Sequence, residues 1–260
     1  PPGQALAHMF AKAERLDPAT PGRIPQDWDV FHKKLAATGQ AVQVGAFPYG
    51  VFGAARDLLG TARLLVGFYD EPDMLHDMME HLTTLWLSLF ERVSREVRIA
   101  HVHLWEDMAG KQGSMISPAM VREFMMPCYD RIAAFVRHAG VSIFSVDTDG
   151  WCGQLAPVML EHGINMLFPF EVQAGNDILE FRRQYPALGI IGGLDKRALA
   201  EGRRAIDLEV RRAQTMARLG RYIPAFDHLI PPDVSWENFS YAAGKLREVC
   251  QPLACAAASS

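Results

Sequence analysis

The 260-residue sequence lacks the marks of several common protein classes. Its 4 cysteines form no C-x-x-C pair and no disulfide framework, so we expect free thiols in a reducing compartment and a cytoplasmic protein. Charges interrupt every apolar stretch before the roughly 18 residues that a membrane span needs. The N-terminus has no signal-peptide pattern. No run of Lys and Arg occurs and the formal net charge is −4, so nucleic acid is not an expected partner.

Hydrophobic residues make up 49% of the sequence and charged residues 22%, a balance typical of a globular protein with a sizeable core. We expect an N-terminal arm and helix over 1–40, a barrel domain over 41–250 and a C-terminal tail over 251–260. The arm is rich in proline, and its helix is predicted from Trp28 to Ala37. The first residue is not Met, so we expect a trimmed start or a fragment.

Short apolar runs alternate with helical patterns from residue 41 onward, which predicts βα units around a parallel sheet. The predicted strands are rich in β-branched or aromatic residues and cover 41–47, 99–107, 141–147, 164–171, 188–193 and 222–227. Helical patterns lie between them; one, over 117–140, has Ser117 as its N-cap, Pro118 behind it and Gly140 at its end.

Six βα units are two short of a closed (β/α)8 barrel. The segment 1–40 is too rich in proline to supply two barrel strands. We therefore predict an α/β fold, a TIM-type (β/α)8 barrel that lacks or does not show its first one or two units. An open flavodoxin-like sheet is the alternative, but the sequence has neither G-x-G-x-x-G nor a P-loop.

Acidic residues follow five consecutive predicted strands, and the working face of a barrel lies at the C-terminal ends of its strands. Acids placed by chance would be scattered over helix surfaces. The position of these acids at the strand ends is the main indication of a functional site that the residues alone provide. The strand-end residues are His103, Glu106, Asp107, Asp147, Asp149, Glu171, Asp195, Lys196, Asp227 and His228.

Several of these residues have a structural alternative. Asp195 precedes a helical pattern and is most simply a cap. Asp149 stands before Gly150, where a turn role and a ligand role are equally well supported. His103 fits a hydrogen-bonded residue of the barrel interior as well as it fits a ligand. Of His101 and His103, one is expected to point into the barrel and the other toward the helices.

Seven segments together resemble the uroporphyrinogen decarboxylase superfamily, which includes the porphyrinogen decarboxylase and cobalamin-dependent methyltransferases. They occur in the family's order over about four-fifths of the chain, and the family's fold is a (β/α)8 barrel. The segments are FPYGVFGAARDLLG (47–60), FYDEPDMLHDMM (68–79), WEDMAGKQGSMISPAMVREFMMPCYDRI (105–132), VDTDGW (146–151), INMLFPFEVQAG (164–175), IIGGLDKRALAEG (190–202) and YIPAFDHLIPPDVSWENF (222–239).

The sequence departs from the zinc pattern of the thiol-methylating relatives. Where they carry H-x-C and a later Cys, this chain has Asp147-Thr148-Asp149 and Asp227, with His228 next to it. Carboxylates and imidazole still suit zinc or a harder divalent cation. We therefore predict metal ligands among Asp149, Asp227, His228 and Glu171, catalytic roles for Glu106, His103 and Asp147, and substrate contacts from Asp107, Phe47 and Trp151.

The resemblance implies three alternatives. The first is demethylation of a methoxylated or N-methylated small molecule, with a corrinoid on a partner protein as methyl acceptor. The second is a decarboxylase without metal, although acidic strand ends would repel a substrate with many carboxylates. The third is an inactive binding barrel. A homodimer is one alternative for the oligomeric state.

Overall fold

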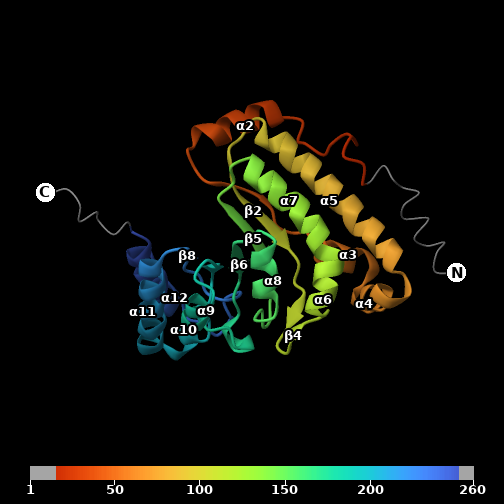
Figure 1. Cartoon of the computed structure of the whole chain (residues 1–260). Helices are drawn as coiled ribbons and strands as arrows, with labels where there is room; N and C mark the ends of the chain where they lie inside the picture. Colours follow the sequence, from red (N-terminus) through yellow and green to blue (C-terminus); the bar gives the residue numbers. More distant parts are fainter. Residues whose placement is uncertain (1–15, 252–260) are drawn as a thin grey trace, which may run out of the picture. The chain divides into compact units, whose positions relative to one another are not determined.

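The computed structural model describes residues 16–251. Its strands form a six-stranded sheet in the order β1-β2-β5-β6-β7-β8 and a two-stranded β3-β4 hairpin (Figure 1). β1 pairs with β2, β6 with β7 and β7 with β8, all in parallel. Sheet order follows chain order and helices connect the strands, so the arrangement is the mixed α/β, TIM-type one that the sequence predicts.

The chain divides into two compact units. Residues up to Glu106 together with Ile116–Ser145 make the first, and Asp107–Met115 together with Val146 onward make the second. The first unit contains α2 (Trp28–Ala37), β1 (Val42–Gly45), α3 (Phe52–Leu59), α4 (Thr61–Asp70), α5 (Pro72–Ser94), β2 (Ile99–Trp105), α6 (Pro118–Met120) and α7 (Met126–His138).

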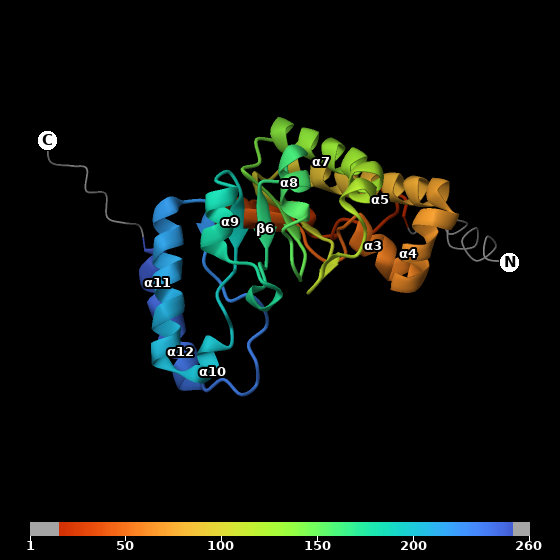
Figure 2. The same cartoon turned by 60° about the horizontal axis from the view of Figure 1, so that its bottom comes forward.

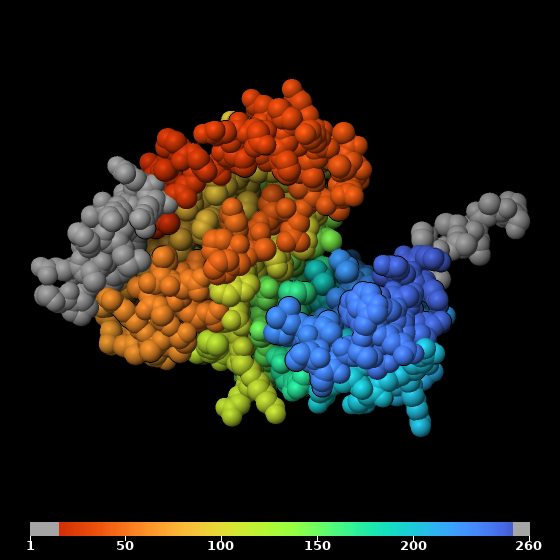
Figure 3. Space-filling view, turned by 180° about the vertical axis from the view of Figure 1, so that it is seen from behind, coloured from red at the N-terminus to blue at the C-terminus, as the bar shows by residue number. Residues whose placement is uncertain are grey.

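The core of the first unit lies under two helices that run side by side, α5 and α7 (Figures 1 and 2). α5 has Pro72 at its first turn and turns a face of Leu and Met residues inward. Tyr129, Phe90 and Met79 are among the largest fully buried side chains of this core. α2 buries only Trp28, whose indole donates to Glu96, and it lies at the surface of the first unit in the view from behind (Figure 3).

The second unit contains β3 (Ala109–Gly110), β4 (Gly113–Ser114), α8 (Leu155–Glu161), β6 (Met166–Phe168), α9 (Ile178–Gln184), β7 (Gly189–Ile191), α10 (Ala198–Glu201), α11 (Arg203–Leu219), β8 (Tyr222–Ile223) and α12 (Trp236–Cys250). β5 (Ile143–Asp147) spans the boundary between the two units. α10, α11 and α12 pack together around Leu199, Ile206, Val210 and Ala242 (Figure 2).

The predicted strands and the helix Trp28–Ala37 are confirmed. The helix predicted over 117–140 starts at the Ser117 cap as expected, but a π-helical turn, Val121–Met125, interrupts it. Pro127 follows this turn and has no N–H to donate, so the regular hydrogen-bond ladder cannot run through it. α3, α4, α8 and the β3-β4 hairpin have no counterpart among the predicted elements.

The structure bears on three predictions about the whole chain: its free cysteines, its lack of a membrane span and its domain boundaries. Cys128, Cys152 and Cys250 are free thiols, and Cys255 lies outside the described residues. No helix in residues 16–251 has the length and apolar character to cross a membrane. The boundaries predicted at residues 40 and 250 stay predictions, and 1–15 and 252–260 lie outside the part that the structure describes.

Candidate functional site

Four carboxylates of the second unit, which lie at or just after the ends of β2, β5 and β6, interact electrostatically around Asp149. Asp107, Asp147 and Glu171 all act electrostatically on Asp149. The imidazole Nε2 of His228 lies 3.6 Å from the Asp149 Oδ2, and both side chains are about two-fifths exposed. This set, which we call the Asp149 cluster, consists of Asp107, Asp147, Asp149, Glu171 and His228. Five of the ten residues predicted for the site thus belong to one group.

The pKa of Asp149 is raised above its ordinary value. Partial burial is the largest cause, and the negative charge of Asp107 is the next. His228 acts in the opposite direction and lowers this pKa, but does not outweigh the other causes. A carboxyl group with a raised pKa holds its proton at a higher pH than an exposed aspartate, as a general acid must.

The backbone around the cluster is held in uncommon conformations. Asp107 has a φ of 41°, in the left-handed region, and its N–H donates to the Asp147 carbonyl at 3.0 Å. Gly150 has a φ of 74°, and a Cβ there would lie 2.4 Å from the Gly110 carbonyl oxygen. Only glycine fits at residue 150, so the turn after Asp149 is fixed by sterics. The Gly150 N–H donates to Glu171 Oε2 at 3.0 Å.

Asn176 connects the loop of Asp149 to the loop of Glu171, and sequence reasoning did not single it out. Its side-chain amide donates to the carbonyls of Gly150 at 2.8 Å and Glu171 at 2.9 Å. Its carbonyl oxygen accepts from the Cys152 N–H at 3.2 Å. The residue is only 1% exposed. Because every polar atom of this side chain is used, Asn176 fixes the two loops that carry cluster acids.

Asp227 has a different environment from Asp149. Its two carboxylate oxygens accept from the backbone N–H groups of Val172 at 2.8 Å and Lys196 at 3.1 Å, and the residue is 0% exposed. It therefore ties together the loops that follow β6, β7 and β8. The sequence predicts Asp227 as a metal ligand together with Asp149 and Glu171, and a shared role for these three residues stays a prediction.

Three of the four predicted metal ligands, Asp149, Glu171 and His228, belong to the Asp149 cluster, but their side chains do not form a set of metal ligands together with Asp227. Both Asp227 oxygens bind backbone amides, one Glu171 oxygen accepts from Gly150, and His228 pairs with Asp149. Within residues 16–251 no group of three or more His, Cys, Asp or Glu side chains is arranged to hold a metal ion. The residues present do not fit a metal in this arrangement, and we derive no catalytic step from one.

Glu106 belongs to the first unit, where it stabilises the start of α3. Its carboxylate accepts from the N–H groups of Val51 at 2.8 Å and Gly53 at 2.7 Å, and from the Tyr129 hydroxyl at 2.5 Å. Val51 offers no side-chain cap, so Glu106 supplies from a distant strand the acceptor that the helix N-terminus needs. Burial still raises its pKa. Sequence reasoning missed its partner Tyr129, which carries no local signal.

His101 and His103 share one hydrogen-bond partner, the buried Ser145 hydroxyl. His101 Nε2 and His103 Nδ1 each lie 2.6 Å from Ser145 Oγ. The expectation that the two histidines point in opposite directions is wrong, because strand residues two apart lie on the same face. The hydroxyl has one proton, so one histidine accepts it and the other donates its own N–H. Burial, together with His103, lowers the pKa of His101 to about 4.

The remaining predicted residues are placed as follows. Phe47, in the first unit, is 61% exposed and its ring meets Trp105 edge-on at 4.9 Å. Trp151, in the second unit, packs against Gly153, where a Cβ would lie 2.4 Å from the ring. Asp195 accepts from the Arg197 N–H at 2.9 Å, so it caps a turn, and the helix that follows begins at Ala198.

Comparison with known families identifies the chain's relatives. The family profile described as uroporphyrinogen decarboxylase (URO-D) matches residues 5–248. The chain belongs to this family. The resemblance predicted from the sequence is therefore confirmed.

One solved structure similar to this URO-D family chain is described as a methyltransferase from Methanosarcina mazei. It aligns with a TM-score of 0.64 and 15% identity over 86% of this chain and 67% of that chain. At this identity the likeness shows the fold. No curated protein matches the sequence.

Proposed function

We propose that this URO-D family chain removes a methyl group from a small methoxylated or N-methylated molecule, with protonated Asp149 as the general acid. The observation that carries the proposal is the position of Asp149, half-buried among like charges and 3.6 Å from His228. Mutual repulsion of carboxylates favours a state in which one of them keeps its proton. The fold neighbour described as a methyltransferase supports this reaction class.

The proton is needed at the oxygen atom of the leaving group. When the C–O bond of a methyl ether breaks, the oxygen keeps the electron pair and would leave as a costly alkoxide. Asp149 gives its proton to this oxygen, becomes a carboxylate, and regains a proton from His228 or from water. A reduced corrinoid on a partner protein would supply the electron pair that accepts the methyl group.

The cluster also indicates the charge of the substrate. Asp107, Asp147 and Glu171 surround Asp149 with negative charge, which repels a polyanion and favours a neutral or cationic small molecule. This is the specific observation against the metal-free decarboxylase alternative with a polycarboxylate substrate. That alternative also uses a protonated acid, so the reaction itself must be measured.

The test uses two methyl donors that differ in their need for a proton. A methyl alkyl ether must be protonated as it leaves, whereas tetramethylammonium leaves as a neutral amine. With reduced free corrinoid as acceptor, demethylated product is quantified by chromatography. Asp149→Asn should slow ether demethylation by about 10²–10⁴-fold and change the ammonium reaction little. Asp233→Asn, at an exposed acid, is the matched control.

Two results would contradict the proposal. Equal slowing of both donors by Asp149→Asn would mean that this residue does not supply the proton. Failure of every methyl donor, together with release of carbon dioxide from a carboxylated substrate, would establish the decarboxylase alternative. Metal content of protein purified without chelator, measured for zinc, manganese and iron, tests the divalent metal predicted from the sequence.

A further inference from the structure

The first unit contains a cavity that shares no lining residue with the Asp149 cluster. It has a volume of about 750 Å³ and lies between the end of α5, the start of β2 and the end of α7. A volume of this size suits a small organic molecule. The lining residues are Leu87, Glu91, Ser94, Arg95, Val97, Arg98, Ile99, Arg131, Ala134, Phe135, His138 and Ala139.

The walls combine apolar and cationic side chains. Val97, Ile99 and Phe135 are buried and supply an apolar floor. Three arginines and one acid, Glu91, line the same cavity, so with histidine neutral the lining carries a formal charge of +2, from 3 minus 1. An apolar floor with a cationic rim is complementary to a molecule with an apolar body and an anionic group.

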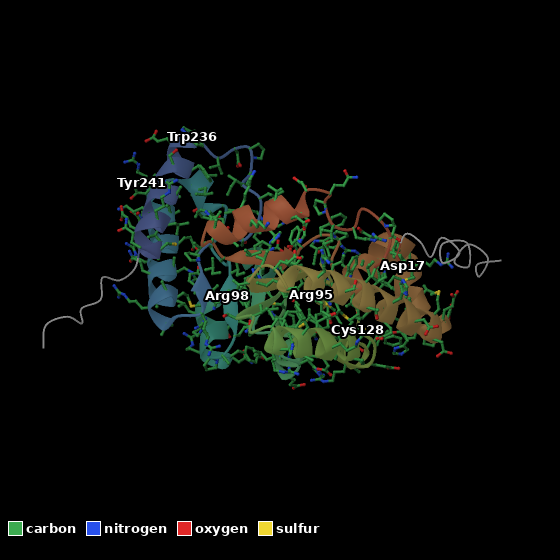
Figure 4. All side chains as sticks on the ribbon, turned by 90° about the horizontal axis from the view of Figure 1, so that it is seen from above. Asp17, Arg95, Arg98, Cys128, Trp236 and Tyr241 are labelled. Atoms are coloured by element: carbon green, nitrogen blue, oxygen red, sulfur yellow. The ribbon has the colours of Figure 1, made fainter. Side chains whose placement is uncertain are left out.

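The three arginines differ in whether their guanidinium groups already have partners within the protein. Arg131 donates to Glu80 at 2.5 Å and to Thr84 at 3.2 Å, so its guanidinium is held in place. Arg95 and Arg98 are exposed, and neither has a hydrogen-bond or ion-pair partner in the part of the chain that the structure describes. Both are labelled in Figure 4, on the segment that joins α5 to β2. Their donors are available to an anion.

Stabilisation of helix ends explains the presence of only some of these cationic residues. Arg95 is the C-cap of α5, and His138 lies in the last turn of α7, where positive charge stabilises the helix dipole. Arg98 directly precedes β2 and caps no helix. The hollow beneath the cations is not needed to stabilise a helix end either.

We infer that this cavity binds a small organic anion, a carboxylate or phosphate on an aromatic or aliphatic body. Arg95 and Arg98 would contact the anionic group and Phe135 the apolar body. A second cavity of about 470 Å³ shares Glu91 and Arg95 with the first, so a longer ligand has room to extend. The inference is independent of the methyl-transfer proposal, since none of its residues belongs to the Asp149 cluster.

The experiment uses two fluorescent probes of matched shape on the whole chain. Anilinonaphthalene sulfonate carries a negative charge, and N-phenyl-1-naphthylamine does not. The anionic probe should bind more tightly to the wild type, and phenyl phosphate or benzoate should displace it. The double variant Arg95→Ala/Arg98→Ala should weaken anionic-probe binding by about tenfold, and Arg95→Lys/Arg98→Lys should restore most of it.

Two further variants separate a cavity from a charged surface. Ala134→Trp fills the hollow and keeps every charge, so it should abolish binding of the anionic probe. Arg204→Ala/Arg211→Ala removes two exposed arginines of α11 and should leave binding unchanged. Circular dichroism verifies that each variant is folded. Equal affinity for both probes, or equal losses in the two double-alanine variants, would overturn the inference.

Discussion

Asp227→Ala removes a carboxylate that holds two loops of the second unit. The substitution leaves the N–H groups of Val172 and Lys196, now bound at 2.8 and 3.1 Å, without acceptors. An unsatisfied buried donor costs about 1–3 kcal/mol. These two donors are partly buried, so we expect a total loss of roughly 2–4 kcal/mol in the free energy of unfolding. For a chain of this length that lowers the melting temperature by roughly 6–12 °C.

The assay is thermal unfolding followed by circular dichroism for a graded series of variants. Asp227→Asn keeps one acceptor oxygen and should lose about half as much stability as Asp227→Ala. Asp233→Ala, at an exposed acid of the following loop, should change stability by less than about 0.5 kcal/mol. If Asp227→Ala is as silent as Asp233→Ala, the two amide bonds do not hold the loops. If a chelator destabilises the wild type as much as Asp227→Ala does, a metal binds there instead.

Three further predictions follow from other acids. The raised pKa of Asp149 means that ionisation of this residue destabilises the folded state, so the Asp149→Asn variant should be more stable than the wild type at pH 7. Thermal unfolding at decreasing pH measures this difference in stability. The difference should vanish below about pH 3.8, where Asp149 carries its proton in both the folded and the unfolded state. Glu106→Gln should destabilise by about 2 kcal/mol, and Tyr129→Phe, which removes one of its bonds, by less; urea unfolding measures both. Asp195→Ala should lower stability by about 1 kcal/mol in the same assay and leave the proposed methyl-transfer activity intact, whereas loss of activity with unchanged stability would make it a site residue.

The strands were predictable because each buried strand is a short apolar run between loops. Val42–Gly45 and Ile143–Asp147 fall inside their predicted runs for this reason. The Ser117 and Ser235 caps carry equally local signals, and both side chains accept from the third residue that follows. The π-helical turn before Pro127 depends on how the helix packs, so periodicity along the sequence cannot place it.

The candidate site was predictable in its residue types but not in the roles of those residues. Strand order brings strand-end acids to one edge, so Asp107, Asp147, Asp149 and Glu171 could be grouped from the sequence. No local pattern reveals that Asn176 joins two loops, because its partners lie up to 26 residues away. Ser145 has the same property, since its histidines are at least 42 residues away in sequence.

Asp149 and Asp227 both follow a barrel strand, yet their surroundings suit them to opposite tasks. Each Asp227 oxygen accepts a backbone N–H, so the position of this carboxylate cannot change without releasing two loops. Glu106 is likewise held in place by Val51, Gly53 and Tyr129, although its complete burial still raises its pKa. Asp149 instead faces other carboxylates and one histidine, and its charge is opposed by its surroundings. A group whose charged form is disfavoured can give and take a proton at small cost, which makes Asp149 the acid through which this face of the barrel would act.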